Sequence, residues 1–297
     1  VVTGSDISES SSVKRLRNLG ATIQLGHQPE MVKQAQVVVK STAIPSSNPE
    51  LEYARLAKIP IIPRAQMLAE LMRMRYGIAV AGTHGKTTTT SMIALCLKEA
   101  QLDPTIVIGG RFDAIGSSAQ KGQGDLLVAE ADESDGSFLL LSPTIAVITN
   151  IDPEHLEHWK TEEALINGFV TFAQKVPFFG FAVLCLDHPT VQSILPRIGR
   201  RIITYGFNSQ ADLVAKNTRS NGINSTFEVV HNQTSLGEVT LSMPGHHNIC
   251  NALAAIAVGL ELQIDFEVLR KALNNFGGVQ RRFTVRGSCL APSAELS

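Results

Sequence analysis

Short apolar runs and segments with helical periodicity alternate along the first part of the chain. Apolar runs short enough for strands occupy residues 22–25, 37–39 and 59–62. Apolar residues recur every three or four positions at 13–19, 32–35, 50–57 and 65–75. Strands that alternate with helices indicate a parallel sheet covered on both faces, in which 37–39 is a buried strand.

A second series of elements follows a junction at 75–77. Buried strands are predicted at 78–81, 105–108, 126–129, 145–148, 182–186 and 202–205. Helices are predicted at 87–100, 162–175, 247–262 and 266–276. Stricter alternation at 226–230 and 239–243 is typical of an antiparallel ribbon. The whole pattern predicts an α/β fold.

Composition adds limits on function. A chain of 297 residues suits two domains, and 44% hydrophobic residues suffice for a buried core. The formal net charge of -1 gives no electrostatic reason to expect a nucleic-acid partner. No apolar run approaches the ~20 residues of a membrane span, and no leader-like segment opens the chain. We therefore expect no membrane partner and a cytoplasmic location.

The four cysteines are scattered, at Cys96, Cys185, Cys250 and Cys289, without a CxxC pair. The first three lie in apolar periodic segments, where a free cysteine acts as a small hydrophobic residue. The spacing predicts a reduced protein with neither a zinc site nor a disulfide framework.

The strongest chemical signal is the segment GTHGKT at 82–87, which a strand precedes and a helix follows. Glycines let backbone N–H groups converge on phosphate, and the helix N-terminus adds a positive dipole. Val80 stands where the general phosphate-loop pattern has its first glycine, so an ordinary glycine turn is the alternative. The predicted ATP-binding residues are Gly82, Thr83, His84, Gly85, Lys86, Thr87 and Thr88.

A carboxylate is needed near such a loop to hold Mg²⁺. The apolar strand at 126–129 ends in Glu130, and Asp132, Glu133 and Asp135 follow. So dense an acidic cluster repels itself unless a cation neutralises it. Glu130 is the first choice as metal ligand and Glu133 the second, and a solvated acidic turn is the alternative.

Two further segments carry polar groups that suit a nucleotide site. His155 follows the strand at 145–148, at the sheet edge where ligands bind, although a surface histidine is the alternative. His247, Asn248 and Asn251 open a long apolar helix, where they either read a base or cap the helix. Arg281 and Arg282 clamp a phosphate or lie in a solvated turn.

Five motifs, taken together and in this order along the chain, resemble those of the Mur ligase family. They are GTHGKTTTT at 82–90, EADESDGSF at 130–138, TNIDPEH at 149–155, PGHHNICNALAA at 244–255 and GVQRRF at 278–283. The resemblance covers nearly the whole chain, including 41–44 and 64–71. It implies a partial Rossmann-like UDP-sugar domain at 1–76 and a central P-loop ATPase domain with a mostly parallel sheet at 77–286. From the same resemblance we expect residues 287–297 to be a tail unlike the family and the amino-acid domain to be missing.

The resemblance also implies a reaction. The carboxylate of UDP-N-acetylmuramate attacks the γ-phosphate of ATP, and L-alanine displaces phosphate from the acyl phosphate, as a step of peptidoglycan synthesis. Lys86, Glu130 and His155 are then catalytic, Thr87 and Glu130 bind Mg²⁺, and His155 binds a second metal. The adenine and γ-phosphate contacts are His247, Asn248, Asn251 and Arg282. Weaker candidates for the UDP-sugar are Asp6, Ser41 and Glu133.

Other readings stay open at this point. A murein-peptide ligase or a folylpolyglutamate synthase-like ligase belongs to the same superfamily, although EADESD running directly into Phe138 favours the alanine-adding members. A non-catalytic nucleotide-binding fragment is the other alternative. From its two ends we expect the chain to bind nucleotide without turnover, and alanine-dependent phosphate release would contradict that.

Overall fold

The computed structural model describes residues 1–112 and 117–277, which divide into two compact units. The first unit is Val1–Leu71 and the second begins at Met72. The division lies within helix α3 (Arg64–Arg73), a few residues before the domain boundary predicted from the sequence. No helix in the described part of the chain has the length and hydropathy needed to cross a membrane.

The first unit contains two separate parallel strand pairs. Its strands are β1 (Thr3–Asp6) with β2 (Thr22–Leu25), and β3 (Val38–Lys40) with β4 (Ile61–Pro63). Its helices before α3 are α1 (Ser11–Asn18), η1 (Pro29–Val32) and α2 (Pro49–Leu56). The prediction of a buried strand at 37–39 was wrong, because Val39 is 41% exposed. A sheet of two strands has no inner strand to bury.

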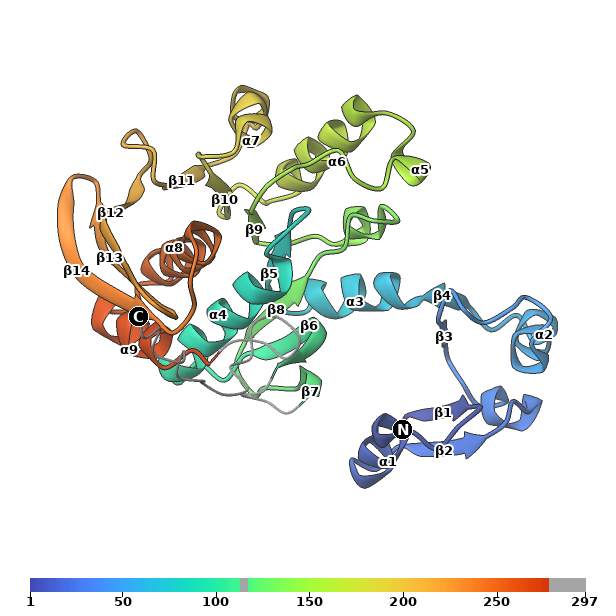
Figure 1. Cartoon of the computed structure of the whole chain (residues 1–297). Coiled ribbons are helices and arrows are strands. Elements are labelled where there is room, and N and C mark those ends of the chain that lie inside the picture. The colour runs from blue at the N-terminus through green and yellow to red at the C-terminus, as the bar shows by residue number, and fades with distance from the viewer. Residues whose placement is uncertain (113–116, 278–297) are drawn as a thin grey trace, which may run out of the picture. The chain divides into compact units, whose positions relative to one another are not determined.

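The second unit is built on one sheet of ten strands, in the order β14-β13-β12-β11-β10-β9-β5-β8-β6-β7 (Figure 1). The strands are β5 (Tyr76–Ala81), β6 (Thr105–Phe112), β7 (Ser117–Gln120), β8 (Leu126–Glu130), β9 (Ile145–Ile148), β10 (Phe181–Cys185), β11 (Ile202–Gly206), β12 (Leu213–Asn221), β13 (Asn224–His231) and β14 (Thr234–Leu241). The neighbours from β6 to β12 pair in parallel. The antiparallel ribbon predicted near the end of the chain is confirmed as β13 and β14.

Helices cover both faces of this sheet (Figure 1). They are α4 (Lys86–Glu99), η3 (Ser137–Leu140), α5 (Leu156–Trp159), α6 (Glu162–Gln174), α7 (Pro189–Ile194), η4 (Leu195–Arg197), α8 (His246–Glu261) and α9 (Phe266–Asn274). Helices α4, α8 and α9 share one apolar core with the sheet, whereas α6 and α7 pack on β9 and β10. Every residue of β9 and β10 is buried. The carboxyl ends of the central parallel strands therefore form the edge at which ligands bind in such sheets.

Candidate nucleotide site

The loop between β5 and α4 has a backbone that only glycine tolerates at two positions. Gly82 has φ +133° and Gly85 has φ +84°. A Cβ atom on Gly82 would lie 2.1 Å from the Thr149 hydroxyl oxygen, and one on Gly85 would lie 2.6 Å from Asn251 Oδ1. Neighbouring chain therefore fills the space around the loop, and the conformation is held tightly.

The segment after β9 holds the loop from the side. The Asn150 side chain accepts from the His84 N–H at 2.7 Å and donates to the His84 carbonyl at 2.9 Å. Thr149 donates to the same carbonyl at 2.6 Å, and the Thr83 hydroxyl accepts from the Asp152 N–H at 2.8 Å. Sequence reasoning gave Thr149 and Asn150 no role of their own, although both belong to the TNIDPEH motif that follows a buried strand of the same sheet.

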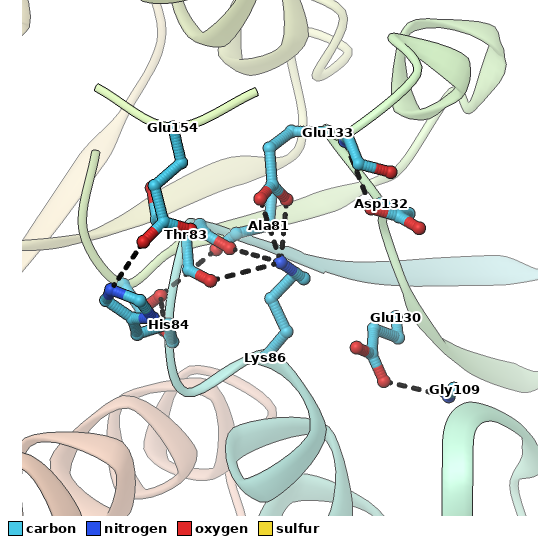
Figure 2. Close-up of polar contacts among 12 residues, drawn as sticks. Ala81, Thr83, His84, Lys86, Gly109, Glu130, Asp132, Glu133 and Glu154 are labelled. Carbon is cyan, nitrogen blue, oxygen red and sulfur yellow. Dashed lines mark hydrogen bonds and ion pairs between the residues drawn. The ribbon is translucent and has the colours of Figure 1, made fainter. Parts of the chain in front are cut away.

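Lys86 makes an ion pair across the loop with Glu133 (Figure 2). Its ammonium group lies 3.0 and 2.8 Å from the two carboxylate oxygens and donates to the Gly82 carbonyl at 2.7 Å. Glu133 is 1% exposed, and Trp159 Nε1 donates to its backbone carbonyl. A carboxylate so deeply buried requires a cation, and Lys86 supplies it.

Thr87 and Glu130 form the second polar pair of the loop. The Thr87 hydroxyl lies 3.0 Å from both carboxylate oxygens of Glu130. The Gly109 N–H donates to Oε2 of Glu130 at 2.8 Å (Figure 2). A hydroxyl beside a carboxylate at a phosphate loop is the hard-oxygen donor set that Mg²⁺ prefers. The residues at this place therefore fit a magnesium ion.

The other acids of the cluster have local partners. Asp132 accepts from the backbone N–H of Ser134, and Asp135 accepts from that of Ser137. Burial acts to raise the pKa of Asp135, but its hydrogen bonds with Ser137 outweigh this and hold the pKa below its ordinary value. These two acids stabilise the turn that carries Glu133 between them.

His155 lies just before helix α5 and has the left-handed φ of +55°. Its Nδ1 atom is 3.5 Å from Glu157 Oε1. The carboxylate of Glu154, the residue directly before His155, contacts the loop histidine instead: His84 Nε2 lies 3.5 Å from Glu154 Oε1 (Figure 2). The side-chain contact of His155 is thus with its own helix, and its assignment to a second metal stays a prediction.

The first turn of α8 lies against the loop. Asn251 Oδ1 accepts from the Thr89 hydroxyl at 3.1 Å, which ties α8 to α4. Asn248 Nδ2 donates to the Pro244 carbonyl at 2.7 Å, which fixes this side chain to the segment before the helix, and no side chain among the described residues caps the N-terminus of α8. A pocket of about 400 Å³ is lined by His84, Gly85, Thr149, Asn150, Cys185, Asp187, His188, Tyr205, His247, Cys250 and Asn251. Its size is that of a small-molecule site.

The wall of the pocket opposite the loop holds residues that the sequence did not single out. Asp187 accepts from the backbone N–H groups of Phe207 and Asn208 at 2.7 to 2.9 Å. A hydrogen bond from the Cys250 thiol lowers the pKa of Cys185, and the same bond raises the pKa of Cys250. Burial raises the pKa of Tyr205 well above its ordinary value.

The remaining predicted site residues lie elsewhere. Asp6 and Ser41, in the first unit, accept from the backbone N–H groups of Ser8 and Ala43 and so stabilise local turns. Arg281, Arg282 and the tail at 287–297 lie outside the described residues.

Known proteins match the chain over nearly its whole length. The Mur ligase middle domain matches residues 80–259, and the Mur ligase family catalytic domain matches residues 1–76. UDP-N-acetylmuramate–L-alanine ligases of Sorangium cellulosum and Anaeromyxobacter dehalogenans are each 56% identical to it, over 97% and 96% of this chain. The chain spans only 61% and 62% of the length of those two relatives.

Solved structures give the same result. A UDP-N-acetylmuramate–alanine ligase from Thermotoga maritima superposes with a TM-score of 0.80 at 30% identity, covering 96% of this chain and 65% of that one. A murein tripeptide ligase from Neisseria meningitides, named for UDP-N-acetylmuramate and L-alanyl-γ-D-glutamyl-meso-diaminopimelate, superposes with a TM-score of 0.81 at 27% identity, covering 94% and 91%. With its loop, its sheet and both family domains in place, this chain belongs to the Mur ligase family.

Proposed function

We propose that this chain carries the nucleotide site of an ATP-dependent ligase that joins L-alanine to UDP-N-acetylmuramate in peptidoglycan synthesis. The observation that carries the proposal is the convergence of Lys86, Thr87 and Glu130 on a glycine loop that is already held in shape. The choice of substrates is supported by the 56% identity to relatives that bear this activity in their names.

Within this proposal, ATP and the muramate carboxylate react by phosphoryl transfer. The carboxylate oxygen attacks the γ-phosphorus, ADP leaves, and the amine of L-alanine then displaces phosphate from the acyl phosphate to form the amide. Lys86 and the loop N–H groups neutralise and position the phosphates, which is the main contribution of a protein to such a reaction. Mg²⁺ held by Thr87 and Glu130 would supply further neutralisation of phosphate charge.

Lys86 has to change partners when nucleotide binds. Its ammonium group now contacts the Glu133 carboxylate and the Gly82 carbonyl. An arriving phosphate competes with Glu133 for the same cation. Glu133 therefore keeps Lys86 pointed across the loop and sets the electrostatic cost of its release.

The remaining assignments belong to the same proposal. His247, Asn248 and Asn251 contact adenine, Arg282 contacts the γ-phosphate, and His155 binds a second metal ion. Asp6, Ser41 and Glu133 are the proposed UDP-sugar contacts. The thiols of Cys96, Cys185 and Cys250 are free, which suits a reducing compartment, and the proposed location is the cytoplasm.

The metal assignment is tested by titrating the chain with ATP in the presence and absence of Mg²⁺. Thr87→Ala should weaken Mg-ATP binding by at least about tenfold and leave metal-free ATP nearly unchanged, since only the metal contact is lost. Thr171→Ala, on the exposed face of α6, is the matched control. Equal losses with and without Mg²⁺ would show that Thr87 is not a metal ligand.

The choice of substrate is tested on a protein of the relatives' full length, of which this chain spans 61% and 62%. The TM-scores of 0.80 and 0.81 show that the fold alone does not separate an alanine ligase from a tripeptide ligase. We expect phosphate release from ATP and UDP-N-acetylmuramate to depend on L-alanine. Dependence on the tripeptide instead would replace the alanine-ligase proposal with the murein-peptide one.

A further inference from the structure

Two thiols, which bind soft metals, and one carboxylate meet in the wall of the pocket opposite the loop. Cys185 ends strand β10, Asp187 follows two residues later, and Cys250 lies in helix α8. One ligand atom from each lies within 4.8 Å of the other two. We name this set the far-wall cluster.

The spacing of these atoms suits a tetrahedral ion. Zinc–sulfur bonds of about 2.3 Å and zinc–oxygen bonds of about 2.0 Å place sulfur and oxygen ligands about 3.5 Å apart in a tetrahedron. Cys250 Sγ lies 3.6 Å from Asp187 Oδ2. The cluster therefore has one tetrahedral edge at its correct length before any ion is bound.

The cluster is also rigid. Three hydrogen bonds from the backbone N–H groups of Phe207 and Asn208 fix the Asp187 carboxylate. Gly206 lets it approach, because a Cβ atom there would lie 2.4 Å from Asp187 Oδ1. Cys185 is only 5% exposed, within the buried end of a central strand. A site already arranged in this way binds an ion without a large ordering cost.

We propose that Cys185, Asp187 and Cys250 bind one zinc ion, and that the ion and the nucleotide exclude one another. Two thiolates and a carboxylate favour zinc over magnesium, which prefers oxygen ligands alone. Each thiol releases its proton to solvent as its Zn–S bond forms, and water completes the tetrahedron.

The exclusion follows from the position of the cluster, and it rests on the proposed nucleotide site. The same pocket is lined by the far-wall cluster, by Gly85 of the loop and by Asn251 of α8. An ion with its water in a pocket of about 400 Å³ takes space that a nucleotide needs. Zinc would thus act as an inhibitor of nucleotide binding.

Cobalt substitution tests the metal site without nucleotide. With Cys289→Ala as the common background, we expect one equivalent of Co²⁺ to give thiolate-to-cobalt charge-transfer absorption that Zn²⁺ abolishes. Cys185→Ser and Cys250→Ser should each weaken Co²⁺ binding by at least about 100-fold, more than an outer-shell partner usually costs. Cys96→Ser, at a cysteine in the core of α4, should bind as the parent does. Absorption that survives in both pocket variants would overturn the proposal.

The exclusion is tested by Mg-ATP titration at fixed free Zn²⁺, held by a zinc buffer because ATP itself chelates zinc. The apparent Kd for Mg-ATP should rise in proportion to free Zn²⁺ in the parent and stay constant in Cys250→Ser. A Kd that ignores Zn²⁺ while Co²⁺ binds would overturn the exclusion. The two proposals fail separately, because ATP binding without zinc tests the proposed function and Co²⁺ binding without ATP tests the cluster.

Discussion

The two walls of the pocket are built from different chemistry. The loop wall is residues 82–87, of which His84 and Gly85 line the pocket. Lys86 and Thr87, which follow them, contact carboxylates from β8 and the turn after it. The far-wall cluster brings two thiols and one carboxylate. Hard oxygen donors and a cation suit phosphate and Mg²⁺, whereas thiols suit a softer ion.

The difference also concerns how each wall is assembled. The loop wall comes from consecutive residues between a strand and a helix, so its chemistry follows from local sequence. The far-wall cluster needs β10 and α8 to meet, and these elements lie far apart along the chain. The residues of the loop wall can therefore be recognised in a sequence motif, whereas the far-wall cluster forms only when distant elements pack together.

The largest effect is expected from removing the cation of the loop wall. Lys86→Ala leaves Glu133 buried without its partner, which should cost about 3–5 kcal/mol in the free energy of unfolding and abolish ATP binding. Urea unfolding and ATP titration measure the two effects. In Lys86→Ala/Glu133→Gln the unfolding free energy should recover while ATP binding stays absent. Recovery of ATP binding in the double variant would show that Lys86 does not hold phosphate.

Gly82→Ala tests how tightly the loop wall is held. The new methyl group would meet the Thr149 hydroxyl and the backbone of Asn150 at a φ of +133°. We expect a loss of at least about 2 kcal/mol in the free energy of unfolding, together with weaker ATP binding. Gly199→Ala, where nothing lies within 4 Å, should change the unfolding free energy by less than about 0.5 kcal/mol. Similar losses at both positions would mean that the loop is not under this constraint.

Cys96 lies outside the far-wall cluster, and its buried thiol should make the stability of the protein depend on pH. Burial raises the pKa of Cys96 from 9.0 to about 12. The unfolded chain releases this proton near pH 9 and the folded chain keeps it, so stability present below pH 9 is lost as the pH rises toward 12. The parent should lose up to about 1.4 kcal/mol per pH unit relative to Cys96→Ala across that window. Parallel pH–stability curves would contradict the prediction.

The smallest effect concerns the bond that joins the helices of the two walls. Thr89→Val removes the hydroxyl that donates to Asn251 and should cost about 1 kcal/mol in unfolding free energy. Thr90→Val is a matched control on the same helix, because its hydroxyl bonds to the Lys86 carbonyl of its own helix. A double-mutant cycle of Thr89→Val with Asn251→Ala should give a coupling of similar size, and zero coupling would deny the contact.

The sequence predicted strands β2 to β4 and helices α1 to α3 in the first unit, and the central strands and longer helices of the second. Apolar runs identified its central strands, because strands buried on both faces carry few polar residues. Strand β12 was missed, since its outer six residues are exposed and polar. Val39 was wrongly placed in a core, because an apolar run cannot show how many strands will flank it.

The candidate site also contains residues that the sequence predicted and contacts that it did not. From the sequence came Lys86, Thr87 and Glu130, and the structure joins Thr87 to Glu130 by a hydrogen bond. The sequence did not reveal that Glu133 pairs with Lys86, or that Thr149 and Asn150 hold the loop. Those contacts cross between the ends of neighbouring strands, where spacing along the chain carries no distance information.

By itself the sequence determined the phosphate loop, the parallel sheet that carries it and the family, because each depends on local residue type and order. Only the tertiary structure decided what faces the loop across the pocket. Scattered cysteines without a CxxC pair gave no reason to expect a zinc site. Packing of α8 on the end of β10 sets Cys250 beside Cys185 and Asp187, and that proximity depends on the fold of the whole sheet.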